Sequence, residues 1–144
     1  MLPAFDLSEP SLPTTGPGDL WFFFPIGYLF TIAVETPVLL VGLTRALSFK
    51  QRLFAGLWLT ACTYPIVVLV LPIVFSSYSR ATYLLVAEVF AALGECALFW
   101  LAFKNQLNPG LTKNLRNFGV IVAANVLSFA GGEVLNATRW FGLF

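Results

Sequence analysis

The chain contains no histidine, and that absence removes several classes of function at once. Bis-histidine haem sites, histidine-type zinc sites and nucleophiles activated by an imidazole all need that side chain. The only methionine is Met1, and the two cysteines, Cys62 and Cys96, form no CxxC pair. We therefore expect no resident cofactor, and we interpret the two cysteines as buried, inert thiols.

Charge is also scarce. Charged residues make up 10% of the 144 residues and hydrophobic residues 58%, and the mean hydropathy is +0.84. A soluble domain of that composition would have too little polar surface to stay hydrated, so the composition indicates an integral membrane protein. The net charge of +1 comes without any run of basic residues, which argues against a nucleic-acid partner.

Four long apolar segments account for most of the chain, at about 20–43, 53–75, 81–103 and 117–138. Each is close to the roughly 20 residues that a helix needs to cross the hydrocarbon core of a bilayer. The connections are short, so successive helices should be antiparallel neighbours. The sequence predicts an all-α membrane protein, a four-transmembrane-helix antiparallel bundle over 20–144. Residues 1–19, rich in proline and glycine, should form an extended tail outside the membrane.

The basic residues are distributed unequally between the two sides of this bundle. The first and third connections carry Arg45, Lys50, Arg52, Lys104, Lys113 and Arg116. The opposite side carries only Arg80 and Arg139. Because Lys and Arg accumulate on the cytoplasmic side, this bias predicts that both termini lie outside the cell, N-out and C-out.

Acidic residues occur where they are costly. Four of the seven, Glu35, Glu88, Glu95 and Glu133, lie inside the apolar segments. An ionisable group near the bilayer centre costs roughly 2.5 to 3.5 kcal/mol, so such residues usually serve an ion pathway, a proton relay or a specific contact. Counted from the predicted outer ends, Glu35 and Glu95 are each fifteen residues into their segments, which is near the midplane.

The other two segments carry neutral polar residues at the same depth. Helical periodicity turns these residues toward the bundle interior. The predicted midplane site for a proton or cation consists of Glu35, Glu95, Thr60, Thr63, Asn125 and Ser128. An outer path to it would be lined by Glu88, Glu133 and Asn136. Whether a metal ion binds is left open, since an all-oxygen site of glutamates remains compatible with the sequence.

The fourth segment also has small residues four positions apart, at Ala124, Ser128 and Gly132. This spacing allows two helix backbones to approach closely. The partner helix is either another helix of the same chain or one from a second copy or a larger membrane complex.

A set of short motifs resembles small, uncharacterised four-span membrane proteins of prokaryotes. The resemblance is carried by Glu35 with Pro37, Thr63 with Pro65, Glu88 with Glu95, and Ala124 to Ser128. It implies a four-span protein of a bacterial or archaeal cell membrane, the inner membrane where there are two, and it implies no activity.

Three functions fit these features. The leading hypothesis is proton- or cation-linked transport or conduction through the intramembrane carboxyl site. The alternative is a noncatalytic subunit of a larger membrane complex, in which the polar groups join helices by hydrogen bonds. The third is an intramembrane enzyme acting on a lipid, with Glu35 and Glu95 as acid and base. The absence of a recognisable nucleophile or cofactor motif favours the first two.

Overall fold

The computed structural model describes residues 17–107 and 111–138 of the chain. All regular structure in these residues is helical: α1 (Pro17–Gly42), α2 (Phe49–Pro65), the π-helix η1 (Ile66–Val70), α3 (Leu71–Val74), α4 (Arg80–Phe103) and α5 (Leu111–Ala137). Within the described ranges, four helical stretches are long and apolar enough to cross a membrane, namely Phe24–Gly42, Phe49–Val74, Arg80–Phe103 and Asn114–Ala137. The prediction of an all-helical chain with four candidate spans is therefore confirmed.

Two helices begin at serine caps. At the start of α2 the hydroxyl of Ser48 accepts from the backbone N–H of Gln51, and the Gln51 side chain accepts from the backbone N–H of Ser48. This capping box satisfies two N–H groups that have no partner inside the helix, so α2 starts at Phe49, earlier than the predicted 53. Ser79 caps α4 in a similar way by accepting from the N–H of Thr82.

The other boundaries also differ from the prediction. α1 begins at Pro17, inside the segment expected to be an extended tail, and α5 begins at Leu111 instead of 117. The rest of the predicted tail, residues 1–16, and the predicted outer residue Arg139 lie outside the described residues.

The second span changes its helical geometry along its length. α2, η1 and α3 follow one another without a break, and η1 is a π-helical segment in which the N–H of Leu71 bonds the carbonyl of Ile66. The carbonyl of Val67 would need the N–H of residue 71 or 72, but the first is already used and Pro72 has none. The hydroxyl of Tyr83 on α4 donates to this carbonyl at 3.1 Å. The irregular segment is thus joined to the neighbouring span.

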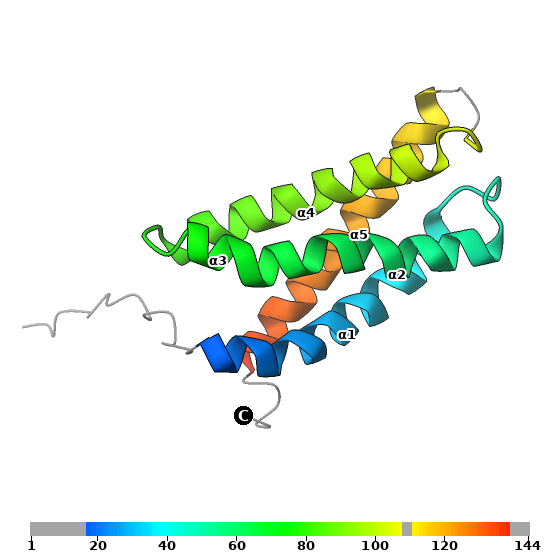
Figure 1. The fold of residues 1–144 in the computed structure, drawn as a ribbon. Helices are drawn as coiled ribbons and strands as arrows, with labels where there is room; N and C mark the ends of the chain where they lie inside the picture. Colours follow the sequence, from blue (N-terminus) through cyan, green and yellow to red (C-terminus); the bar gives the residue numbers. More distant parts are fainter. Residues whose placement is uncertain (1–16, 108–110, 139–144) are drawn as a thin grey trace, which may run out of the picture.

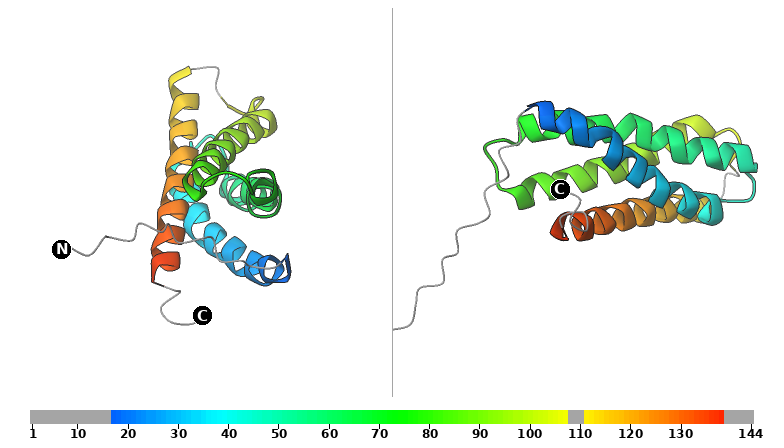
Figure 2. Two further views of the ribbon diagram at one scale, coloured as in Figure 1. Left: turned by 90° about the vertical axis from the view of Figure 1, so that its left-hand side faces the viewer. Right: turned by 90° about the horizontal axis from the view of Figure 1, so that it is seen from below.

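The spans pack as a four-membered ring. α1 packs against α2 and α5, and α4 packs against the second span and α5, whereas α1 and α4 face each other diagonally, as do α2 and α5. Residues 43–48 and the end of α4 lie at one end of the molecule, and the turn between α3 and α4 lies at the other (Figure 1). α5 is inclined to the other spans: in one view of Figure 2 it is seen from the side, whereas α2 is seen nearly end-on.

The apolar core occupies only one end of this ring. It contains Leu39, Leu43, Leu47, Ala55, Leu59, Phe99, Phe103, Leu107, Ile121 and Ala124. In every span these residues lie toward the end of the ring where residues 43–48 and 104–107 are found. Only 17% to 22% of each span's most apolar stretch is buried within the chain, and many large apolar side chains are exposed, among them Leu29, Val41 and Leu93. A lipid bilayer is the environment that such a surface requires.

The carboxyl end of α1 is capped by residues from other helices. Arg52 of α2 donates to the carbonyl of Leu40, and Arg116 of α5 donates to that of Gly42 at 3.2 Å. These carbonyls belong to the last turn of a helix, where backbone acceptors lack partners and the helix dipole favours cations. Two of the basic residues behind the predicted orientation therefore also have a structural role.

Candidate functional site

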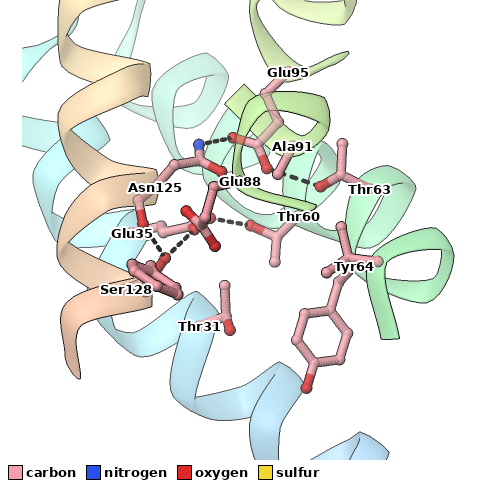
Figure 3. Close-up of a pocket in the computed structure, with 12 residues that line it drawn as sticks. Thr31, Glu35, Thr60, Thr63, Tyr64, Glu88, Ala91, Glu95, Asn125 and Ser128 are labelled. Carbon is pink, nitrogen blue, oxygen red and sulfur yellow. Dashed lines mark hydrogen bonds between the residues drawn. The ribbon is translucent and has the colours of Figure 1, made fainter. Parts of the chain in front are cut away.

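A cavity of about 100 Å³ lies between the four spans (Figure 3). It is lined by Thr31 and Glu35 of α1, Thr60, Thr63 and Tyr64 of α2, Val67 of η1, Glu88, Ala91 and Glu95 of α4, and Asn125, Ser128 and Phe129 of α5. A cavity needs about 10–15 Å³ of such space to hold one water molecule, so this one is large enough for water. Nine of the twelve lining residues have a polar side chain, although the cavity lies inside an apolar bundle.

Glu35 is held between two helices. Its side chain is 2% exposed. Thr60 Oγ1 of α2 donates to Glu35 Oε2 at 2.8 Å, and Ser128 Oγ of α5 donates to Glu35 Oε1 at 2.6 Å. Both carboxyl oxygens therefore have a partner.

Glu95 is held by the same two helices from the opposite corner of the ring. Its side chain is 1% exposed. Thr63 Oγ1 of α2 donates to Glu95 Oε1 at 2.9 Å, and Asn125 Nδ2 of α5 donates to Glu95 Oε2 at 2.8 Å. The six residues predicted to form a midplane site are thus brought together, and Figure 3 shows their contacts.

The ring arrangement explains why two polar residues are needed on each of α2 and α5. Each of these helices contacts both α1 and α4. Residues three apart on a helix lie near each other but point in somewhat different directions, so each can reach a different neighbour. On α2, Thr60 turns to Glu35 and Thr63 to Glu95; on α5, Ser128 and Asn125 divide the same two carboxyls.

No basic side chain lines the cavity in the part of the chain that the structure describes. In the described part of the chain an ion pair joins Arg80 to Glu133 at 2.7 Å. It lies near the surface, with side chains 41% and 37% exposed. The side chains that donate to Glu35 and Glu95 are therefore neutral. A buried carboxylate without a cation is costly, whereas a protonated carboxyl group is not. The arrangement suits groups that take up and release a proton or attract a cation.

The predicted outer path is brought together only in part. Glu88 lines the cavity, seven residues before Glu95 on α4 and toward the turn between α3 and α4. Glu133 does not line it and is instead paired with Arg80. Asn136 is exposed and does not line it either.

Tyr64 is a cavity residue that the sequence analysis missed. A Cβ atom on Gly27 would lie 2.1 Å from the Tyr64 hydroxyl, so the tyrosine rests where α1 has no side chain. Its ring lies 5.3 Å from that of Phe24 and 5.6 Å from that of Tyr28, measured between centroids. Of these three residues, Tyr64 itself lines the cavity. The glycine four residues before Thr31 was the available signal, and alone it is weak.

The small-residue spacing on α5 serves contacts within the chain. Ala124 is fully buried in the apolar core, and Ser128 is buried against Glu35. Gly132, in contrast, has open space around its Cα, since a Cβ added there would meet nothing within 4 Å. Ala124 and Ser128 therefore make contacts within the chain.

Comparison with protein-family models, with curated proteins and with solved structures finds no match for this chain. The fold and the site together define its class, a small helical protein with four candidate membrane spans and a buried pair of carboxyl groups facing one cavity.

Proposed function

We propose that this protein carries protons, alone or coupled to another solute, across a membrane, with Glu35 and Glu95 as the proton-binding groups. The observation that supports this most is their convergence: two buried carboxyls on diagonally opposed helices line one cavity, with neutral donors and no basic side chain among the described lining residues. Acidic residues inside membrane spans commonly mark ion pathways and proton relays.

A proton fits the site better than a metal ion. All four oxygens of the two carboxyl groups already accept a hydrogen bond from a threonine, serine or asparagine side chain. A carboxyl oxygen that accepts one hydrogen bond keeps a second lone pair, so a proton can be added while the contacts persist. A Ca²⁺ or Mg²⁺ ion would need a shell of about six or more oxygen ligands, which the two carboxyl groups alone do not complete.

The proposal includes an orientation. We place the spans as an antiparallel bundle in a bacterial or archaeal inner membrane, with both termini outside, because the basic residues accumulate at one end. Along each span, the cavity residues lie on one side of the Glu35 and Glu95 layer and the apolar core on the other. In this orientation the cavity faces outward and the core closes the cytoplasmic side. A transporter that opens its inner side in a separate step fits this better than a permanently open pore.

The experiment is a flux measurement on purified protein in liposomes that contain a pH-sensitive dye. A potassium gradient with valinomycin supplies the voltage, and the rate of internal pH change is recorded. Glu35→Gln and Glu95→Gln remove the titrating groups while keeping side-chain size, and we expect each to reduce the rate to that of protein-free liposomes. Glu9→Gln makes the same chemical change outside the predicted spans and should keep the wild-type rate. Wild-type rates in both site variants would refute the proposal.

The same satisfied contacts also favour a second candidate, a noncatalytic subunit in which the carboxyl groups join four helices. Interhelical hydrogen bonds in membranes contribute about 0.6 kcal/mol on average and up to about 1.7 kcal/mol. This role predicts no flux from the isolated chain, and a defined larger complex when the protein is purified from its native membrane under mild conditions.

A further inference from the structure

The three hydroxyl groups that contact Glu35 and Glu95 each lie within hydrogen-bond distance of two acceptors. Thr60 Oγ1 is 2.8 Å from Glu35 Oε2 and 3.0 Å from the carbonyl oxygen of Gly56. Thr63 Oγ1 is 2.9 Å from Glu95 Oε1 and 3.1 Å from the carbonyl oxygen of Leu59. A hydroxyl has one hydrogen to donate, so it serves one of these acceptors at a time.

Ser128 repeats the arrangement on α5. Its Oγ is 2.6 Å from Glu35 Oε1 and 2.9 Å from the carbonyl oxygen of Asn125. When such a hydroxyl donates to the backbone, its lone pairs face the carboxyl oxygen and can accept from a protonated carboxyl group. When it donates to the carboxyl oxygen, it stabilises the ionised form. Each hydroxyl contact can therefore reverse without movement of the helices.

Asn125 is different because its amide nitrogen cannot reverse its role. Asn125 Nδ2 lies 2.8 Å from Glu95 Oε2 and 3.0 Å from the carbonyl oxygen of Ile121. Both neighbours are acceptors, and the nitrogen donates one of its two hydrogens to each. The carbonyl of Ile121 determines which way the amide group is turned. Glu95 Oε2 is consequently always an acceptor at this contact.

We propose that neutral Glu95 carries its proton on Oε1 and donates it to Thr63 Oγ1, with Asn125 holding Oε2 as the carbonyl oxygen. Thr63 is then a positioning residue whose hydrogen bond reverses whenever Glu95 gains or loses its proton. Glu35 faces a reversible hydroxyl at each oxygen, so its proton has two alternative positions, toward Thr60 or toward Ser128. The assignment rests on the proposed function in one respect, because that function is the reason why Glu95 gains and loses a proton.

The proton balance involves only water and the carboxyl group. On loading, a hydronium ion in the cavity transfers its proton to Oε1, where an O–H bond forms and a water molecule remains; release reverses these steps. The other titratable groups that face the cavity are Glu35 on α1, Tyr64 on α2 and Glu88 on α4. The described lining residues of α5, Asn125, Ser128 and Phe129, carry no titratable group.

Infrared difference spectroscopy of the protein in hydrated lipid, recorded between low and high pH, tests the assignment. The carbonyl stretch of neutral Glu95 is the band that disappears in Glu95→Gln. We expect Asn125→Leu to move this band to higher frequency, because the variant removes the donor to the carbonyl oxygen Oε2. A band that stays in place in Asn125→Leu but moves in Thr63→Val would put the proton on Oε2 and overturn the proposal.

A second pair of variants tests the role of Thr63 even if Asn125→Leu fails to fold. Thr63→Val keeps the side-chain shape and removes the hydroxyl, so we expect the pH midpoint of the Glu95 band to shift. Thr63→Ser retains the hydroxyl and should restore the wild-type midpoint. An unchanged midpoint in Thr63→Val would refute the role of Thr63.

The outcome separates this inference from the proposed function. Wild-type protein that shows the expected bands but no proton flux in liposomes would leave the assignment standing and refute the transport function. If Glu95→Gln abolished the flux but the Glu95 band did not respond to substitution of Asn125 or Thr63, the transport function would stand and the proton assignment would be refuted.

Discussion

Replacing Gly56 by alanine tests whether the site depends on the close approach of α1 and α2. A Cβ atom at this position would lie 2.8 Å from Thr36 Oγ1 and 3.0 Å from Thr36 Cα. The second atom belongs to the backbone, so a change of rotamer cannot relieve the contact. Thr60, which donates to Glu35, lies one turn further along the same helix. The added methyl group would therefore push α1 and α2 apart close to one of the four carboxyl contacts.

The size of the effect follows from these distances. Carbon atoms in ordinary contact are about 3.5–4.0 Å apart, so the two helices must separate locally by about 0.5–1 Å. A separation of that size lengthens the contact from Thr60 to Glu35 beyond the usual limit of about 3.0 Å for a hydroxyl donor. Overpacking costs about 1–3 kcal/mol and the lost hydrogen bond about 0.5–1.5 kcal/mol, while the better helix propensity of alanine returns up to about 1 kcal/mol. We expect Gly56→Ala to lower the free energy of unfolding by roughly 2 kcal/mol.

Unfolding in mixed micelles titrated with dodecyl sulfate, followed by circular dichroism, measures this free energy. The matched control is Gly119→Ala on α5, where a Cβ atom would meet nothing within 4 Å. We expect that variant to be as stable as wild type or more stable by up to about 1 kcal/mol. If Gly56→Ala were at least as stable as Gly119→Ala, the reasoning from close helix approach would be wrong.

Two further substitutions test contacts around the site. Tyr83→Phe removes the hydroxyl that donates to the carbonyl of Val67 in the π-helical segment; we expect a loss of about 0.6 to 1.7 kcal/mol in the same unfolding assay. The control is Tyr78→Phe, at a largely exposed tyrosine, which should change the free energy of unfolding little. Equal effects of the two variants would contradict the role given to Tyr83. Arg80→Gln breaks the half-exposed ion pair with Glu133; we expect a cost of at most about 1 kcal/mol that shrinks at high salt. A larger, salt-independent loss would show that this pair is more deeply buried than the structure has it.

The sequence could predict which polar residues lie close together, because the bilayer thickness restricts depth. Helical rise converts a residue count into a position along the span, so polar residues of four segments could be assigned to one layer. The structure brings Glu35, Glu95 and their four neutral partners together in that layer. Their role in proton transfer stays a prediction.

The pairing within that layer could not be predicted. Depth and periodicity do not say which helices are diagonal, and the ring order of the spans decides that Thr60 reaches Glu35 while Thr63 reaches Glu95. The position of Glu133 along its span likewise did not predict its contact, because its partner Arg80 is at the end of another helix. The π-helical segment is defined by the backbone hydrogen bonds after Pro65. Its apolar residues, Ile66–Val70, have no feature that distinguishes a π-helix from an α-helix in the sequence.

The one-sided distribution of polar and apolar side chains also determines where a membrane voltage would act. Under the proposed function, water that filled the cavity from outside would carry the potential to the carboxyl layer, so most of the voltage would fall across the apolar core that ends at Leu39 and Phe99. Moving one elementary charge through the full potential is worth about 2.3 kcal/mol per 100 mV. Binding a proton at Glu35 or Glu95 from the cavity would then depend little on voltage. The opening of the apolar core would be the step that the membrane potential drives or opposes.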